Sequence, residues 1–196
     1  MSMKPSTQYL AALDDAKRHH AAHKTYSGKF LRPHAPFIKE IIDRLGCQTI
    51  LDYGCGKGEQ YLWRNADETG SIPVGMTIEE YWGISVTKYD PAYPPFAAEP
   101  VGKFDLVICT HVLGSIPVLD LPWVVDRLYS LSSKALYIAE KIAPVKKKVF
   151  QKPDLHPFGW NATRWMTAIK REKPIEVVLS VREKRADGVF VERFNL

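Results

Sequence analysis

Four short runs of the chain are apolar on both faces, and stretches with helical periodicity lie between them. The runs are residues 49–53, 84–89, 104–109 and 135–139. Helices cover both sides of a parallel sheet, so runs of this kind are typical of buried parallel strands. We therefore predict an α/β fold in which these four runs form a parallel sheet.

Apolar residues at helical spacing predict the helices. The expected helices cover residues 6–22, 34–45, 59–65 and 121–131. Gly46 stands where a glycine commonly ends a helix. Residues 77–80 read Thr-Ile-Glu-Glu, the capping-box pattern that begins a helix.

The end of the chain has a different pattern. Residues 175–183 and 189–194 alternate between apolar and polar positions, and Ala186-Asp187-Gly188 joins them. An Asp-Gly pair between two such runs is a strong hairpin signal. We expect a mostly parallel sheet that closes with an antiparallel β-hairpin.

Composition and charge narrow the class of protein. The 196 residues, 45% hydrophobic and 25% charged, suit one soluble globular domain and exclude intrinsic disorder. We expect an N-terminal helical segment over residues 1–24 and the main domain over residues 25–196. A net charge of +5 permits an anionic partner without requiring one.

Membrane spans, targeting peptides and metal frameworks are not expected. The longest uncharged apolar stretch, residues 106–119, is shorter than the roughly 20 residues that a spanning helix needs. The first residues have no apolar core of a signal peptide. Three cysteines without a Cys-x-x-Cys pair predict neither disulfides nor a metal site. These features predict a cytoplasmic protein.

Residues 50–59, Ile-Leu-Asp-Tyr-Gly-Cys-Gly-Lys-Gly-Glu, carry the most specific chemical signal. A buried strand runs into Gly54, Gly56 and Gly58, which let a ligand touch the main chain. A helix start beyond them would suit a carboxylate or phosphate. The spacing is not that of a dinucleotide site, and no Gly-Lys-Ser/Thr follows to make a phosphate-binding P-loop.

This motif, Leu-Asp-Tyr-Gly-Cys-Gly-Lys-Gly, resembles motif I of the class I S-adenosylmethionine-dependent methyltransferases. Residues 104–117, Phe-Asp-Leu-Val-Ile-Cys-Thr-His-Val-Leu-Gly-Ser-Ile-Pro, resemble the fourth-strand segment of the same family. The resemblance covers the chain from about Thr25 to its end. It implies a Rossmann-like three-layer sandwich, with residues 25–196 as the methyltransferase domain and S-adenosylmethionine as the cofactor.

The resemblance also implies roles for single residues. Asp52 and the backbone of Gly54, Cys55 and Gly56 would hold the methionine part of the cofactor, and Asp90 would accept both ribose hydroxyls. Gly58 would allow close packing of helix and strand. The remaining cofactor-binding positions that it implies are Tyr26 and Gly28 before the first strand, and Cys109 and Thr110 at the end of the fourth.

The chain departs from the family pattern in three places. Only 13 residues separate Asp90 from Phe104, so the third-strand region is shortened or missing. Gly114-Ser115 stand where many relatives carry Glu-His. Residues 66–83 are longer than a simple connection, and form either a lid or a cover for the sheet edge.

Several features have two interpretations. Asp90-Pro-Ala-Tyr93 resembles the signature of methyltransferases that act on base amines in DNA, although ribose binding by Asp90 is favoured. His19, His20 and His23 lie on one predicted helix, and a solvated face is favoured over a metal site. Residues 146–148, three lysines, form a solvated loop or contact substrate phosphates.

His111 and His156 are the candidate general bases, because His111 follows the fourth strand and His156 lies in a turn-rich aromatic loop. The acceptor is expected to be a small molecule or a sugar hydroxyl. A nucleic-acid base amine is the alternative acceptor. A protein that binds S-adenosylmethionine without transferring its methyl group is a second alternative.

Overall fold

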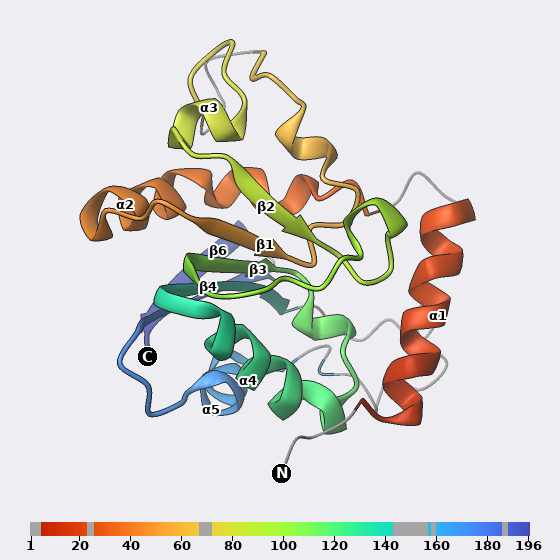
Figure 1. The fold of residues 1–196 in the computed structure, drawn as a ribbon. Helices are drawn as coiled ribbons and strands as arrows, with labels where there is room; N and C mark the ends of the chain where they lie inside the picture. The colour runs from red at the N-terminus through yellow and green to blue at the C-terminus, as the bar shows by residue number, and fades with distance from the viewer. Residues whose placement is uncertain (1–4, 23–25, 67–71, 143–156, 158–159, 186–187) are drawn as a thin grey trace.

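The computed structural model describes residues 5–22, 26–66, 72–142, 157, 160–185 and 188–196. A six-stranded sheet in the order β2-β1-β3-β4-β5-β6 forms its centre (Figure 1). All neighbouring strands pair in parallel except β5 and β6, which are antiparallel. The predicted α/β fold and its closing hairpin are confirmed. The strands are β1 (Ile50–Tyr53), β2 (Val86–Tyr89), β3 (Phe104–Thr110), β4 (Ser132–Ile142), β5 (Glu176–Arg185) and β6 (Gly188–Asn195).

Helices cover both faces of the sheet and make it a three-layer sandwich (Figure 1). On one side, α2 and α3 pack through Ile38 and Trp82 into one buried cluster; on the other, α4 and α5 pack through Leu128 and Trp165 into a second. Burying apolar residues on both faces is what the uninterrupted apolar runs predicted. The helices are α1 (Thr7–Ala22), α2 (Ala35–Leu45), α3 (Ile78–Trp82), α4 (Leu121–Leu131) and α5 (Ala162–Ile169).

Two helix boundaries formed as the sequence predicted. Gly46 follows α2 with φ of 57°, in the left-handed region where glycine costs least. At α3, the Thr77 hydroxyl accepts the Glu80 amide and the Glu80 carboxylate accepts the Thr77 amide. This capping box is therefore present.

The expected helix at residues 59–65 is wrong. Only a 3₁₀ turn, Glu59–Tyr61, forms there. The Arg32 guanidinium donates to the carbonyl oxygens of Gln60 and Trp63, at 3.4 and 3.0 Å. These carbonyls would otherwise accept helical hydrogen bonds, so a distant side chain competes with the helix.

The sheet ends at β2. Residues 90–103 hold a single 3₁₀ turn, Pro94–Phe96, and no strand, so the expected loss of the third strand is confirmed. The described residues of the 66–83 segment pack against α2 and β2 through Ile72, Ile78 and Trp82. They therefore cover the sheet edge.

None of the helices in the described part of the chain is both long enough and apolar enough to cross a membrane. Cys47, Cys55 and Cys109 are buried and free. The described residues include no cluster of three metal-ligating side chains.

Candidate functional site

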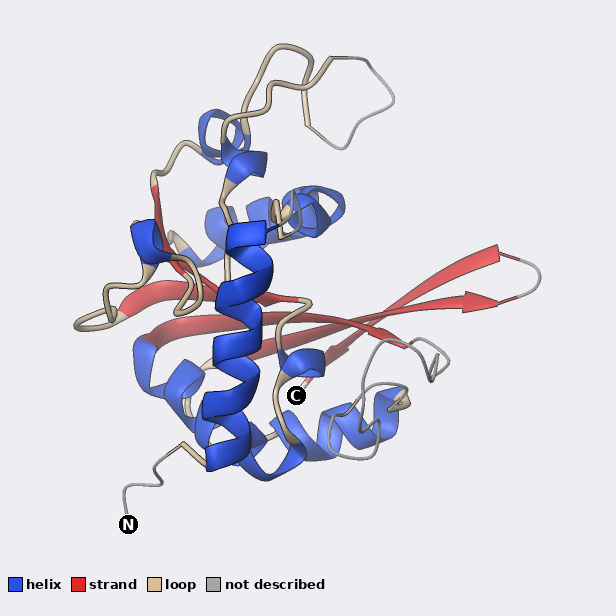
Figure 2. Cartoon of the chain, turned by 90° about the vertical axis from the view of Figure 1, so that its right-hand side faces the viewer, coloured by secondary structure: helices blue, strands red, loops and turns tan. Residues whose placement is uncertain are grey.

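A cavity of about 580 Å³ lies where β1, β2 and β3 end, beneath α1. Its size is within the range of about 300–1,000 Å³ typical of small-molecule sites. Figure 2 shows α1 crossing in front of the carboxyl ends of the strands, the edge where parallel sheets bind ligands. Ala12, Leu13 and Ala16 of α1 form part of its apolar wall.

The glycine loop after β1 forms one wall of the cavity with bare main chain. The amides of Gly54 and Cys55 donate to the Tyr89 carbonyl, at 2.7 and 3.1 Å. A Cβ on Gly56 would lie 2.2 Å from the Tyr26 carbonyl oxygen, and one on Gly54 would lie 2.3 Å from Val112. Larger residues therefore cannot form this wall without displacing the segments around it.

Asp52 places a buried carboxylate under the loop. One oxygen, Oδ2, accepts the Tyr61 hydroxyl at 2.8 Å, whereas Oδ1 has no hydrogen-bond partner. Burial raises the pKa of Asp52 to about 7, although the Tyr61 hydroxyl opposes this shift. Because an unpaired buried acceptor is costly, Oδ1 is suited to a donor from a ligand.

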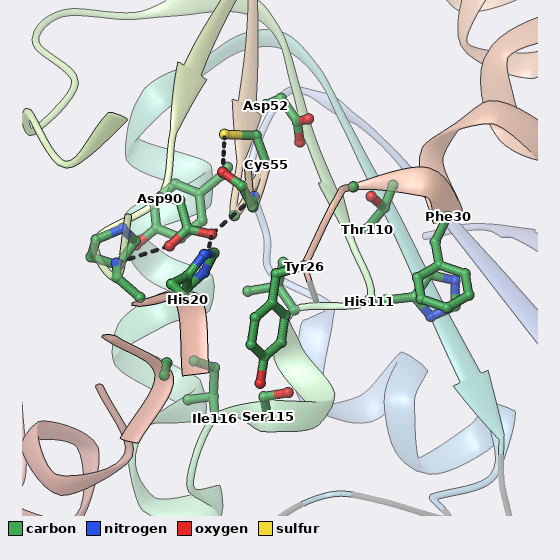
Figure 3. A pocket seen from close by; sticks show the side chains of 18 of the residues that line it. His20, Tyr26, Phe30, Asp52, Cys55, Asp90, Thr110, His111, Ser115 and Ile116 are labelled. Atoms are coloured by element: carbon green, nitrogen blue, oxygen red, sulfur yellow. Dashed lines mark hydrogen bonds and ion pairs between the residues drawn. The ribbon is translucent and has the colours of Figure 1, made fainter. Parts of the chain in front are cut away.

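Asp90, directly after β2, faces the same cavity (Figure 3). Its Oδ2 accepts the Gly56 amide at 2.9 Å and its Oδ1 accepts the Ala92 amide at 2.8 Å. An ionised carboxylate offers about four acceptor sites. Two backbone bonds therefore fix Asp90 and leave it able to accept two more donors.

His20 of α1 is a site residue that the sequence did not reveal. It is only 7% exposed, with Nε2 3.9 Å from Asp90 Oδ2, so the expectation that it lies on a solvated helix face is wrong. Its ring stacks with those of Tyr26 and Tyr93, at centroid distances of 4.7 and 5.3 Å. Burial lowers the pKa of His20, while Asp90 opposes that shift.

Two neighbours of His20 on the predicted helix differ in position. His19 also lines the cavity, and its Nδ1 is 3.0 Å from the Asp15 carbonyl oxygen. His23 lies outside the described residues. Helix α1 is only weakly amphipathic, so its sequence does not show which of its faces will be buried. Packing against other elements decides that His20 is the buried histidine.

Tyr26 and Gly28 form the segment that approaches the glycine loop. The Tyr26 carbonyl accepts the Lys57 amide at 2.7 Å, and the Tyr26 hydroxyl points toward Ser115 (Figure 3). The buried Gln60 amide, oriented to satisfy both groups, donates to the carbonyls of Ser27 and Gly28 at 2.6 and 2.9 Å. Gln60 therefore holds the backbone of the Tyr26–Gly28 segment in place.

His111 stands at the opposite side of the cavity from Asp90. Its φ of 58° is rare for a residue with a side chain, and its amide donates to the Ala139 carbonyl at 2.8 Å. Its ring packs on Phe30 at a centroid distance of 4.9 Å. Burial first, and the positive charge of Lys141 second, lower its pKa to about 4. His111 is therefore neutral at neutral pH.

Behind His111 lies a buried polar pair. The His34 ring is 6.2 Å from the His111 ring, and its Nδ1 is 2.9 Å from the Tyr137 hydroxyl. Burial and the neighbouring His111 lower the pKa of His34 to about 4.

Glu140 of β4 holds the turn after His111. Its carboxylate accepts the Leu113 amide at 2.8 Å, and burial raises its pKa to about 8 against the effect of several backbone amides. Gly114 and Ser115 belong to the 3₁₀ turn that Glu140 supports, Leu113–Ser115. Glu140 therefore lies close to Gly114 and Ser115, where the chain departs from the family pattern. The sequence around Gly114 and Ser115 could not reveal this carboxylate, because Glu140 belongs to another strand.

The cavity brings together most residues that the resemblance assigned to the cofactor. Gly58 instead faces Phe96 and Lys88, where a Cβ would come within 3.0 and 3.3 Å, and Cys109 is fully buried within the sheet. Neither lines the cavity. His156 and residues 146–148 lie outside the described residues. The expected positions that do line it are Tyr26, Gly28, Asp52, Gly54, Cys55, Gly56, Asp90, Thr110 and His111.

The parallel sheet, the glycine loop after β1 and the acid that ends β2 define a Rossmann-like α/β protein with a candidate ligand site at its carboxyl edge. A family model described as a methyltransferase domain matches residues 7–140, and the chain belongs to this family of class I S-adenosylmethionine-dependent methyltransferases. No curated protein and no solved structure matches the chain.

Proposed function

We propose that this protein transfers the methyl group of S-adenosylmethionine to a hydroxyl of a small molecule or sugar. The observation that carries the proposal is the unpaired buried Oδ1 of Asp52, a residue that lines the same cavity as Gly54 and Gly56. An unpaired acceptor next to a glycine cradle fits the ammonium and carboxylate of an amino acid. Three free, buried cysteines support a reducing, cytoplasmic setting.

The residues present fit the cofactor. Asp52 Oδ1 would accept the amino group, the main chain at Gly54–Gly56 would contact the methionine part, and Asp90 would accept the ribose hydroxyls with its remaining acceptor sites. Asp90 is already held by two backbone amides, so it needs no reorganisation to do so. Tyr26 and Gly28 would close over the cofactor from the segment before α2.

Bound S-adenosylmethionine supplies a methyl group on a positively charged sulfur, and this sulfur takes the bonding electron pair when the methyl leaves. The chain's contribution is mainly alignment, worth up to roughly 7–11 kcal/mol. A ring nitrogen of neutral His111 would accept the hydroxyl proton as the oxygen bonds to carbon. Phe30, half-exposed and packed on His111, would support the acceptor.

Calorimetry tests the cofactor. Titration with S-adenosylmethionine, its demethylated product and NAD should show heat with the first two and none with NAD. Asp90→Ala should weaken binding by at least about tenfold, because a charged hydrogen bond of about 1.5–3 kcal/mol is lost. Absence of heat with S-adenosylmethionine would contradict the proposal.

His111→Gln tests the proposed base. We expect kcat to fall with the cofactor Kd unchanged, and by less than the roughly 10²–10⁴-fold typical of a base with a pKa near neutrality, because the pKa of His111 is about 4. Since the pKa of His111 is about 4, activity of the native protein should show no inflection near pH 6.5 from this group. His156→Gln is the parallel variant for the second candidate base. An unchanged kcat in His111→Gln would remove His111 from this role.

The two alternatives have less support. Tyr93, which would stack on a flipped base, packs against His20 and Phe96, with the latter ring centroid 5.6 Å away. Asp90 Oδ2 accepts the Gly56 amide, which holds the carboxylate beside the glycine loop and favours the ribose-binding role over the base-amine role. Methyl transfer from labelled S-adenosylmethionine to any hydroxyl acceptor would rule out a purely regulatory protein.

A further inference from the structure

A basic surface lies beside His111, on the side of the sheet that α2 covers. Tyr137 and Ala139 of β4 are buried on that side, and side chains alternate along a strand, so Lys141 faces the same way. The β4–β5 register places Arg182 directly beside Lys141. The next strand places Arg193 beside Ser180, one step away on the same face.

The basic surface is close enough to act on the site. The His111 amide bonds to Ala139, two residues before Lys141. Lys141 and Arg182 both act electrostatically on His111, and they lower its pKa after burial does. Arg193 is held over the Phe37 ring, 3.1 Å from its centroid.

Acidic residues on these strands do not neutralise the surface. Glu140, Glu183 and Glu192 alternate to the opposite face of the sheet. Glu176 shares the basic face, but it is engaged by Arg44, with Oε2 2.7 Å from Nη1. Among the described residues, neither Lys141 nor Arg182 forms an ion pair.

We propose that Lys141 and Arg182 bind an anionic group of the methyl acceptor, a phosphate or a carboxylate, while its reacting hydroxyl lies in the cavity beside the His111 ring. Arginine and lysine are the usual ligands of both anions. This inference rests on the proposed function and narrows the acceptor to an anionic small molecule, such as a phosphorylated or acidic sugar.

Binding of the anion alone tests the proposal. The full chain is titrated with inorganic phosphate and, separately, with acetate, and the Arg182 side-chain and His111 amide resonances are followed by NMR. We expect one or both anions to shift these signals. The anion that binds more tightly indicates whether the acceptor carries a phosphate or a carboxylate. Arg182→Gln and Lys141→Gln should each weaken binding by about tenfold, equivalent to about 1.4 kcal/mol.

Lys103→Gln is the matched control. It removes the same charge from an exposed lysine just before β3, at the opposite end of the strand from the site. Equal weakening in Lys103→Gln and Lys141→Gln, or no shift with either anion, would overturn the proposal. Arg182→Lys should retain most of the binding, which shows that charge rather than folding is measured.

Two further measurements separate this inference from the proposed function. S-adenosylmethionine should bind Arg182→Gln as tightly as the native chain. A native chain that binds S-adenosylmethionine but neither anion overturns this inference alone, and one that binds an anion but not S-adenosylmethionine overturns the proposed function. Binding of a single-stranded oligonucleotide more than a hundredfold tighter than phosphate would replace the small acceptor with a nucleic acid.

Discussion

Asp52 meets opposite requirements in the unliganded protein and in the proposed complex. Without a ligand, burial favours its protonated form and raises its pKa to about 7. A cationic amino group next to Oδ1 would favour the ionised form. Binding would therefore release a proton wherever the carboxyl is protonated beforehand.

We expect the affinity for S-adenosylmethionine to fall by about tenfold per pH unit as the pH drops below 7. Calorimetry in buffers of different ionisation enthalpy should detect the released proton near pH 6.5. Asp52→Asn should bind weakly and independently of pH in this range. A pH-dependent affinity that persists in Asp52→Asn would assign the titration to another group.

Substitution of Gly56 tests whether the glycine loop after β1 must present bare main chain to the cofactor. Gly56→Ala places a Cβ 2.2 Å from the Tyr26 carbonyl, so we expect at least about tenfold weaker cofactor binding, measured by calorimetry. Gly102 has a similarly positive φ of 84° but nothing within 4 Å of its Cβ position. Gly102→Ala should lower the free energy of unfolding by about 1–2 kcal/mol and leave binding unchanged. Equal binding losses in the two variants would mean that backbone strain, not contact, is responsible.

At the scale of elements, α1 is tied to the domain at both ends. Ser6, just before α1, donates from its hydroxyl and amide to Asp120, at 2.6 and 2.8 Å, and Tyr9 packs edge-on against Trp123. At the other end His20 lies against Asp90. The helix therefore bridges the start of α4 and the acid after β2, across the cavity.

Asp120→Ala should release the first end of α1. We expect about tenfold faster hydrogen exchange over Thr7–Ala22 and weaker cofactor binding, since two hydrogen bonds to a buried carboxylate are lost. Asp126→Ala, which removes an ion pair of 2.7 Å with Arg171 on the surface of α4, is the control and should change neither. Unchanged exchange in Asp120→Ala would show that apolar contacts alone hold α1.

Elements whose stability is local were predictable from the sequence, and those decided by distant contacts were not. The capping box at Thr77 and Glu80 and the left-handed Gly46 depend on neighbours in the chain. The turn at Glu59–Tyr61 depends on Arg32, 28 residues away from Gln60. In the site, the glycine motif revealed the cradle, whereas His20 and Glu140 act through partners on other elements and left no local pattern.

At the scale of the whole molecule, two buried acids control stability near neutral pH. Burial raises the pKa of Asp52 to about 7 and that of Glu140 to about 8. Above pH 6.5 the unfolded chain has already lost these protons while the folded chain still holds them. Folding then binds protons, so the free energy of unfolding should fall as the pH rises from 6.5 to 8.

The slope is bounded by about 1.4 kcal/mol per pH unit for each acid. His34 and His111, with pKa values lowered to about 4, affect stability at lower pH. The free energy of unfolding should rise as the pH increases from about 4 to 6.5, because in this range these histidines bind protons in the unfolded chain but not in the folded one. Chemical denaturation of the unliganded chain between pH 6.5 and 8 measures the effect, and the double variant Asp52→Asn, Glu140→Gln should flatten it. A stability that rises over this interval would contradict the assignment.

The described side chains that line the cavity come from residues between Tyr9 and Val124, and none comes from β4, β5 or β6. The proposed anion contacts, Lys141 and Arg182, come only from β4 and β5. The proposed contacts to the anionic group of the acceptor are thus encoded after the residues that would bind the cofactor, whereas Phe30 and His111, which would contact the reacting part of the acceptor, are not. Chimaeras in which the portion after Ser132 is exchanged between relatives should still use S-adenosylmethionine as the methyl donor but methylate a different acceptor.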